Sequence, residues 1–255
     1  MGFTSLVLRF AAPVPKLTAF SRFLFIGPHP DDIEIGAGAT AAAMTAAGKH
    51  VSFLICTDGR YGLENAPHGT TPEALIGIRQ EEAYKSADTL GVSDVRFLGL
   101  RDGGGYTNED LLEGIVRVIG DVQPDVIFAP DPFVPGECHF DHLSVGKTAR
   151  TAAFFAPFRE IMSLHGAQCA DVQALAYYMT ARPNRFVRTN RFFEQQIKAI
   201  KCHSSQFPDG SEALKSLTLY LKLRAFDFGL RSFCGRAEGF RVLGKTQMHC
   251  MPEAK

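Results

Sequence analysis

Short apolar runs recur along the first two thirds of the chain, and a longer segment with helical spacing follows most of them. The runs lack the polar–apolar alternation of half-exposed strands, which predicts strands that are buried on both faces of a parallel sheet. They occupy residues 22–27, 51–56, 95–98 and 125–129, and a further strand is expected at 172–179.

The segments between these runs have the pattern of helices. Residues 72–90 carry the clearest signals, with Thr71 as N-cap, Pro72 at the first helical position and Gly91 after the end. Residues 111–119 place their apolar side chains on one helical stripe. Further helices are expected at 37–49, 142–155, 192–202 and 212–228, the last two on either side of a loop at 204–210.

This order of elements predicts an α/β fold, with a doubly wound, mostly parallel, Rossmann-like sheet flanked by helices. We expect a single domain over residues 1–255. Its α/β core would span about 20–181, and a helical and basic C-terminal portion, 182–255, would complete the pocket. The secondary-structure signal weakens after Ala181.

The composition narrows the class of protein. The chain has 255 residues, 45% of them hydrophobic, and its 27 Lys and Arg balance 27 Asp and Glu. Such a chain is not disordered, and a net charge of zero provides no field to hold a nucleic acid. The balance is uneven, because residues 1–181 hold 13 basic and 21 acidic side chains, whereas 182–255 hold 14 and 6. Charge asymmetry of this kind is a hint about partners.

No stretch of about 18 apolar residues occurs, so we expect no transmembrane segment. The first 17 residues lack the pattern of a secretory signal, which favours a cytoplasmic protein. Six cysteines without a C-x-x-C pair are expected to be reduced thiols. They are Cys56, Cys138, Cys169, Cys202, Cys234 and Cys250.

Two clusters of polar residues follow predicted strands. The first, Pro28-His29-Pro30-Asp31-Asp32, follows the first strand, and the second, His139-Phe140-Asp141-His142, lies in the loop after the fourth. Ligands of such sheets bind beyond the carboxyl ends of the strands. A hydrolytic zinc site needs about three protein ligands, an open position for water and a separate carboxylate to take a proton. The two clusters together predict such a site.

The residues alone leave the roles within the clusters open. One of the adjacent carboxylates Asp31 and Asp32 can bind the metal while the other stays beside the water. His142 can bind the metal while His139 faces the substrate, and Asp141 can hold an imidazole in one tautomer. Alternatively, either Asp31 or Asp32 is only a turn residue, and Asp141 is the N-cap of the helix that follows.

The sequence resembles the LmbE-like (PIG-L) N-acetylglucosaminyl deacetylases. The similarity covers about residues 20–240, and the pair His-Pro-Asp-Asp and His-x-Asp-His is its most specific part. Its other motifs are, in chain order, Thr57-Asp58-Gly59, Arg79 with Glu82, Pro124-Asp125-Val126-Ile127 and His203-Ser204-Ser205-Gln206.

The resemblance implies a hydrolase that removes the acetyl group of an N-acetylglucosamine-type sugar or glycoconjugate. It also implies one Zn²⁺ per chain, or another divalent metal, bound by His29, Asp32 and His142. A zinc amidohydrolase acting on a non-sugar N-acyl substrate is the alternative. The substrate is a small molecule or glycoconjugate, a nucleic-acid partner is not expected, and a homo-oligomer is possible.

The resemblance also implies catalytic and substrate-binding roles. Asp31 would be the general base, and His139 would stabilise the oxyanion or protonate the departing amine, with Asp141 orienting His139. Arg79 and Asp102 match positions that hold sugar hydroxyls in the family. The residues themselves offer alternatives. Arg79 lies on an apolar helical face, where a core ion pair with Glu82 or Asp58 would equally explain a charged side chain. Asp102 precedes three glycines and would equally suit a turn.

Two basic features suggest an anionic substrate. Arg60 stands where members of the family often carry an acidic residue, so it either faces the pocket and favours an anionic group or points to solvent. Four arginines recur every three residues in the basic C-terminal portion, although Pro183 argues against one helix through them. They are Arg182, Arg185, Arg188 and Arg191.

Three rival hypotheses fit the sequence less well. Residues 36–41 satisfy the dinucleotide-binding pattern G-x-G-x-x-A, with Asp58 at a suitable distance, but the pattern starts too far beyond the first strand. A structural zinc site at Cys138-His139 and Cys202-His203 lacks the usual ligand spacing. A binding module without turnover is disfavoured by the complete set of candidate ligands, base and acid.

Overall fold

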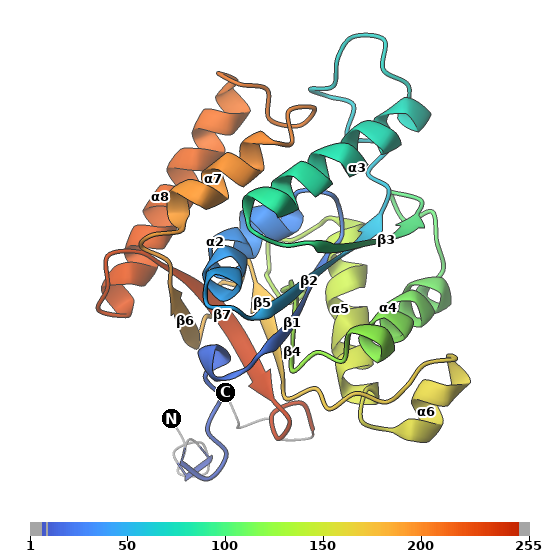
Figure 1. The fold of residues 1–255 in the computed structure, drawn as a ribbon, viewed down its shortest axis with the longest axis vertical. Coiled ribbons are helices and arrows are strands. Elements are labelled where there is room, and N and C mark those ends of the chain that lie inside the picture. The colour runs from blue at the N-terminus through green and yellow to red at the C-terminus, as the bar shows by residue number, and fades with distance from the viewer. Residues whose placement is uncertain (1–6, 9, 250–255) are drawn as a thin grey trace.

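The computed structural model describes residues 7, 8 and 10–249, and its centre is a seven-stranded sheet of order β3-β2-β1-β4-β5-β7-β6 (Figure 1). The first five strands run parallel, whereas β7 is antiparallel to both β5 and β6. The strands are β1 (Arg22–Gly27), β2 (His50–Thr57), β3 (Asp94–Leu100), β4 (Val126–Pro130), β5 (Ala174–Tyr178), β6 (Arg185–Arg188) and β7 (Ala237–Gly244).

Helices cover both faces of the sheet, which confirms the predicted doubly wound α/β fold. One face is covered by α2 (Asp32–Ala46), α3 (Pro72–Thr89) and α7 (Phe193–Lys201), and α8 (Glu212–Arg231) packs directly on β7. The other face is covered by α4 (Asn108–Val122), α5 (Phe140–Phe155) and α6 (Arg159–Leu164). A short 3-10 helix, η1 (Leu17–Ala19), precedes the first strand.

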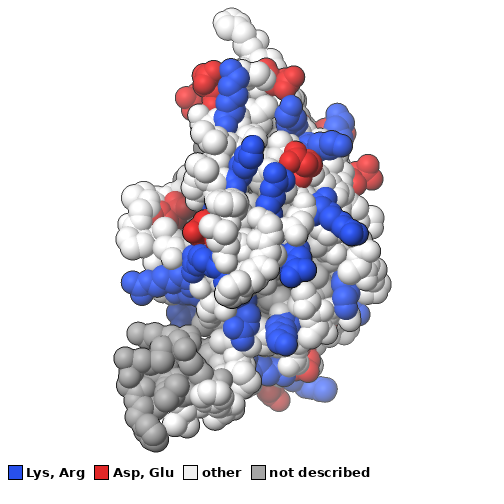
Figure 2. Space-filling model, turned by 90° about the vertical axis from the view of Figure 1, so that its left-hand side faces the viewer, with Lys and Arg blue, Asp and Glu red and all other residues white. Residues whose placement is uncertain are grey.

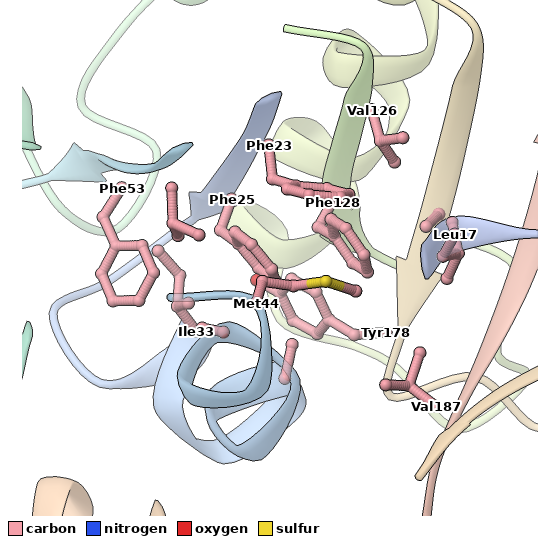
Figure 3. Close-up of a cluster of buried hydrophobic side chains, with 14 of the residues drawn as sticks. Leu17, Phe23, Phe25, Ile33, Met44, Phe53, Val126, Phe128, Tyr178 and Val187 are labelled. Carbon is pink, nitrogen blue, oxygen red and sulfur yellow. The ribbon is translucent and has the colours of Figure 1, made fainter. Parts of the chain in front are cut away.

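Each strand sends alternate side chains into two separate cores. On one side Phe25 stacks on Phe128 with ring centroids 4.2 Å apart, and Ile33 and Met44 of α2 close over them (Figure 3). On the other side Leu24 and its neighbours pack against α4 and α5. Because both faces are buried, the strands read as continuous apolar runs in the sequence.

The first helix begins earlier than the sequence suggested, at Asp32 rather than at residue 37. The segment 36–41 therefore lies inside α2 and not in a turn after a strand, which excludes the dinucleotide-binding geometry. A Cβ on Gly36 would overlap the ring of Tyr178 in β5, so this glycine allows α2 to pack closely on the sheet.

The C-terminal portion departs most from the predicted elements. The sequence pattern missed α6 and the two strands β6 and β7. The arginine series is divided, because Arg185 and Arg188 belong to β6 while Arg182 and Arg191 flank it. The guanidinium of Arg185 donates to the carbonyl oxygens of Val14 and Pro15. The series is therefore not one continuous face.

Two further observations concern the described residues. None of the helices they form is long and apolar enough to cross a membrane. The five cysteines among them are free thiols, and Cys250 lies outside the described range together with part of the N-terminal stretch.

Candidate metal centre and its surroundings

The two polar clusters meet because β1 and β4 are neighbours in the sheet. His29 follows β1, Asp32 is the first residue of α2, and His142 lies in the first turn of α5. Nδ1 of His29 is 3.1 Å from Oδ2 of Asp32, and Nε2 of His142 is 3.4 Å from the other oxygen, Oδ1. Ligand atoms of these three residues all lie within 4.8 Å of one another, which suits a single metal ion.

The outer nitrogen of each imidazole is held by a carboxylate. Nε2 of His29 lies 3.1 Å from Oδ1 of Asp102 and 3.2 Å from Oδ2 of Asp141. Nδ1 of His142 lies 2.9 Å from Oε2 of Glu137. Metal-binding histidines typically have this arrangement, because the outer carboxylate fixes the tautomer and makes the inner nitrogen a better donor. The residues present therefore fit a divalent metal that takes nitrogen and oxygen ligands.

The carboxylates around the cluster stabilise positive charge on its two imidazoles. Burial acts to raise the pKa of Asp32, but His142 and His29 hold it well below its usual range. Burial acts to lower the pKa of His142, but Asp32 and Glu137 raise it to about 9. The pKa of His29 is raised well above its usual value by three carboxylates that outweigh burial. Protons and a metal cation would compete for the same nitrogens.

Asp31 diverges from Asp32 although the two are adjacent. Its φ of 139° is an unusual backbone angle for a residue with a side chain, and its carboxyl is not part of the ligand group of His29, Asp32 and His142. Oδ2 of Asp31 accepts a hydrogen bond of 3.0 Å from Nη2 of Arg79. Burial raises the pKa of Asp31 to about 6, against the opposing effect of Arg79. The loop therefore separates one carboxylate at the metal cluster from a second one beside it.

The side chain of Arg79 is buried and hydrogen-bonded within the protein. It is 3% exposed, and besides Asp31 it donates to the carbonyl oxygens of Gly59 and Pro30. The structure forms the ion pair that the residues alone suggested, with Asp31 as the partner rather than Glu82 or Asp58, and the substrate contact of Arg79 stays a prediction. Glu82 instead accepts hydrogen bonds from Ser204 and Ser205.

Arg60 is engaged by an acidic neighbour. Its guanidinium donates two hydrogen bonds, of 2.7 and 2.9 Å, to Oδ2 of Asp58, and Glu73 lies 3.7 Å away. Its charge is thus compensated within the protein. The side chain does not stand free in solvent, because Asp58 holds it, and its contact with an anionic group of the substrate stays a prediction.

Asp141 and Asp102 both contact Nε2, the outer nitrogen of His29. Asp141 accepts hydrogen bonds from the amides of Gly103 and Gly104, both 3.0 Å, and from the Tyr106 hydroxyl, 2.8 Å. Its carboxylate lies 3.9 Å from Nδ1 of His139, to which its backbone amide donates, and its role of orienting His139 in catalysis stays a prediction. Asp102 contacts His29 with one oxygen and the amide of Tyr61 with the other, and its contact with a sugar hydroxyl stays a prediction.

His139 is the N-cap of α5, a role the sequence offered to Asp141. Its Nδ1 accepts a hydrogen bond of 3.2 Å from the amide of Asp141. Burial together with His29 and His142 lowers its pKa, so the ring is neutral near pH 7. A neutral ring whose Nδ1 accepts carries its proton on Nε2, and the side chain is 47% exposed. His139 is therefore a hydrogen-bond donor at the open side of the cluster.

Sequence reasoning missed Glu137 and Tyr106. Glu137 lies five residues before His142 in a loop rich in proline, and it also accepts from the amide of His139. Tyr106 follows the three glycines after Asp102. For Glu137 the available signal was an acidic residue shortly before the His-x-Asp-His motif, whereas Tyr106 contacts Asp141, 35 residues further along the chain, which local patterns do not reveal.

A cavity of about 340 Å³ opens beside the cluster and is lined in part by Asp32, Glu137 and His142. Helix α8 contributes Tyr220 to its wall. A second cavity of the same volume, at the amino ends of β1, β2 and β3, lies away from these residues and is lined by Arg22, His50 and Asp94 among others. The cavity beside the cluster is therefore the candidate substrate site.

Basic side chains gather on the side of the molecule formed by α7, α8 and β6. Figure 2 shows this face, on which Lys and Arg clearly outnumber Asp and Glu. None of the four arginines at 182, 185, 188 and 191 lines the cavity beside the cluster, as far as the described residues show. The structure therefore does not connect this basic surface with the candidate substrate site.

Comparisons with known proteins agree with this geometry. Residues 24–153 match the family model described as PIG-L, GlcNAc-PI de-N-acetylase. Diacetylchitobiose deacetylase of Thermococcus kodakarensis is 33% identical over 236 residues, which cover 91% of this chain and 87% of that protein. A 1D-myo-inositol 2-acetamido-2-deoxy-alpha-D-glucopyranoside deacetylase of Catenulispora acidiphila is 33% identical over 68% of this chain and 60% of its own length. The solved structure of N,N'-diacetylchitobiose deacetylase from Pyrococcus horikoshii superposes with a TM-score of 0.88 at 28% identity, over 99% of this chain and 97% of that one.

Proposed function

Because this chain belongs to the PIG-L family of de-N-acetylases, we propose that it is a zinc-dependent hydrolase that removes the acetyl group of an N-acetylglucosamine-type sugar. The observation that carries the proposal is the arrangement around His29, Asp32 and His142. Two imidazoles, each backed by a carboxylate, converge on one carboxylate, while a second carboxylate, Asp31, stands beside them. This is the donor set and the separate base that a hydrolytic metal site needs.

His29, Asp32 and His142 would hold the metal ion. When bound, zinc supplies a Lewis acid for the amide carbonyl and lowers the pKa of water. Asp102, Asp141 and Glu137 keep the two imidazoles in the required tautomer and orientation.

Asp31 would accept the proton of the attacking water. Its pKa of about 6 leaves it largely ionised at neutral pH and close to the range in which general bases are most effective. Arg79 fixes the carboxyl through Oδ2. His139 would donate a hydrogen bond from Nε2 to the oxygen that becomes negative, because its Nδ1 is occupied by the amide of Asp141. Asp31, once protonated by the attacking water, would return that proton to the departing amine.

The test is acetate release by the metal-depleted protein with and without added zinc. The substrate panel would hold N-acetylglucosamine, N-acetylated glycoconjugates and N-acetyl amino acids without a sugar. We expect zinc-dependent release from the sugar substrates. Release from the amino acids alone would favour the non-sugar amidohydrolase, and no release with any divalent metal would refute a metal-dependent deacetylase.

A further inference from the structure

The outer face of α8 carries a stripe of large apolar side chains that is exposed to solvent. The four side chains follow one another at intervals of four, three and four residues, and each is between 55% and 60% exposed. They are Leu219, Leu223, Phe226 and Leu230. The helix lies at the edge of the molecule (Figure 1), and its inner face packs on α7 and β7. A contiguous apolar surface of this kind on a soluble protein marks an interaction site.

The spacing of this α8 stripe is that of a contact between two helices. Apolar residues at alternating intervals of four and three stay on one narrow line along a helix, and such a line forms the seam of a coiled coil. Helix α7 is not the partner, because it packs against the inner residues Leu214, Leu221 and Ala225. The exposure of the stripe shows that no other described helix covers it. The seam therefore fits a helix of a second chain.

The charges beside the α8 stripe have opposite signs on its two sides. Lys222 and Asp227 are five residues apart, which places them about 140° apart around the helix, one on each side of the stripe. Lys222 is exposed and forms no ion pair with a described residue, and Asp227 has an exposed contact of 3.6 Å with Arg231. Lys215, on the side of Lys222, is paired with Glu212 at 2.7 Å.

This arrangement of charges selects between two kinds of partner. An anionic lipid surface would attract Lys222 but repel Asp227. A second α8 that runs in the same direction would match both residues, because charged side chains on the two flanks of a seam pair across parallel helices. The charges therefore favour a copy of this helix over a lipid surface.

From this spacing and these charges we propose that the α8 stripe joins two copies of the chain, whose α8 helices pack side by side and parallel about a two-fold axis. Each stripe residue then meets its own counterpart, and Lys222 of each copy pairs with Asp227 of the other. In an antiparallel pair both lysines would lie on one side of the seam and both aspartates on the other, so this ion pair would not form. The proposal concerns assembly and is independent of the proposed activity.

The other basic side chains of this face (Figure 2) act against the pairing. Lys198 of α7 and its neighbours would repel their counterparts on the second copy. Salt screens such repulsion between exposed charges but leaves apolar contacts in place. We therefore expect the association to persist at about 0.5 M salt, at which the binding of a basic surface to an anionic one is lost.

Sedimentation equilibrium of the full chain, at low salt and at 0.5 M salt, tests the contact. We expect the wild type to have an even multiple of the chain mass of 27.9 kDa. Leu223→Glu combined with Phe226→Glu should halve the mass of the assembly, because carboxylates in the centre of an apolar contact raise the dissociation constant about 100-fold or more. Leu164→Glu, at an apolar residue of α6 that is 83% exposed, is the matched control and should keep the mass of the wild type.

The orientation is tested by exchanging the charges beside the seam. Lys222→Glu should raise the dissociation constant about ten-fold, because the ion pair occurs twice across the two-fold axis and is replaced by repulsion. Asp227→Lys should have a similar effect, and the combination of both substitutions should restore most of the wild-type affinity. Both positions are exposed, and circular dichroism would show that the variants keep the fold.

Several outcomes would overturn the proposal. A monomeric wild type, an unchanged mass in the variant of Leu223 and Phe226, or an equal loss in Leu164→Glu would refute the contact. An unchanged dissociation constant in Lys222→Glu would refute the parallel arrangement. If the wild type is monomeric and sediments with vesicles of phosphatidylglycerol and phosphatidylcholine at low salt, whereas the variant of Leu223 and Phe226 does not, the stripe binds lipid and not a second copy.

Discussion

Arg79 donates a hydrogen bond of 3.0 Å to the carboxylate of Asp31, and this contact joins the buried face of α3 to the loop that carries the proposed base. The same guanidinium donates to the carbonyl oxygens of Gly59 and Pro30. One planar guanidinium thus binds three acceptors around Asp31, whose φ is unusual. Arg79 acts on the site through Asp31 and is a positioning residue.

Arg79→Lys should therefore lower kcat without removing the metal. A lysine carries one compact ammonium group and does not reproduce three hydrogen bonds made by a planar fork. We expect kcat to fall about 10- to 100-fold, with zinc content by mass spectrometry near that of the wild type. Lys85→Gln, on the exposed face of the same helix, is the control. Loss of zinc in Arg79→Lys would contradict the separation of base and metal ligands.

Asp31→Asn should abolish turnover while zinc remains bound. The amide has the shape of the carboxylate but does not accept a proton, so we expect a loss of about 100- to 10,000-fold in kcat. His29→Ala removes a proposed ligand and should lose the metal as well. The two variants are compared by acetate release and metal content. If Asp31→Asn loses zinc as completely as His29→Ala, the assigned roles are wrong.

The sequence was sufficient to predict that the two polar clusters meet, because the topology dictates it. In a doubly wound sheet the ends of β1 and β4 are adjacent, so motifs after these strands must lie together. The apolar runs identified those strands without ambiguity. The divergence of Asp31 from Asp32 was also expected, although the start of α2 at Asp32 was not.

The partners of the outer nitrogens were not predictable in the same way. Asp141 faces His29 because Gly103 and Gly104 turn their amides toward its carboxylate, a contact between segments about 40 residues apart. The strand β7 was missed because Gly239 and the buried Glu238 interrupt its apolar pattern. Both features depend on tertiary contacts, which local periodicity does not encode.

Glu137→Gln should weaken metal binding more than it harms the fold. Oε2 of Glu137 holds Nδ1 of His142, and loss of the negative charge makes the inner nitrogen a poorer donor. We expect zinc affinity to fall about 10- to 100-fold, measured by competition with a chelator at fixed pH. Glu109→Gln, an exposed residue of α4, is the control. Unchanged affinity would show that Glu137 has no part in supporting the metal.

Glu238 makes stability depend on pH near neutrality. This buried carboxyl accepts hydrogen bonds from the amides of Ala39 and Thr40 and from Gln196. Burial outweighs these contacts and raises its pKa to about 7 from an ordinary value of 4.5. Between these two values the folded chain keeps a proton that the unfolded chain releases, so the free energy of unfolding falls as pH rises and is constant above about 7.

Glu238→Gln removes this titration and provides the measurement. The difference in unfolding free energy, wild type minus variant, should decline by up to about 3 kcal/mol from pH 4.5 to pH 7.5 in denaturant titrations. The lost hydrogen bond to Thr40 shifts the variant by a constant amount and leaves this slope unaffected. Glu194→Gln, an exposed residue of α7, should run parallel to the wild type. A difference that rises with pH would mean that Glu238 is stabilised as a carboxylate, and a flat difference would mean that its pKa is the same in both states.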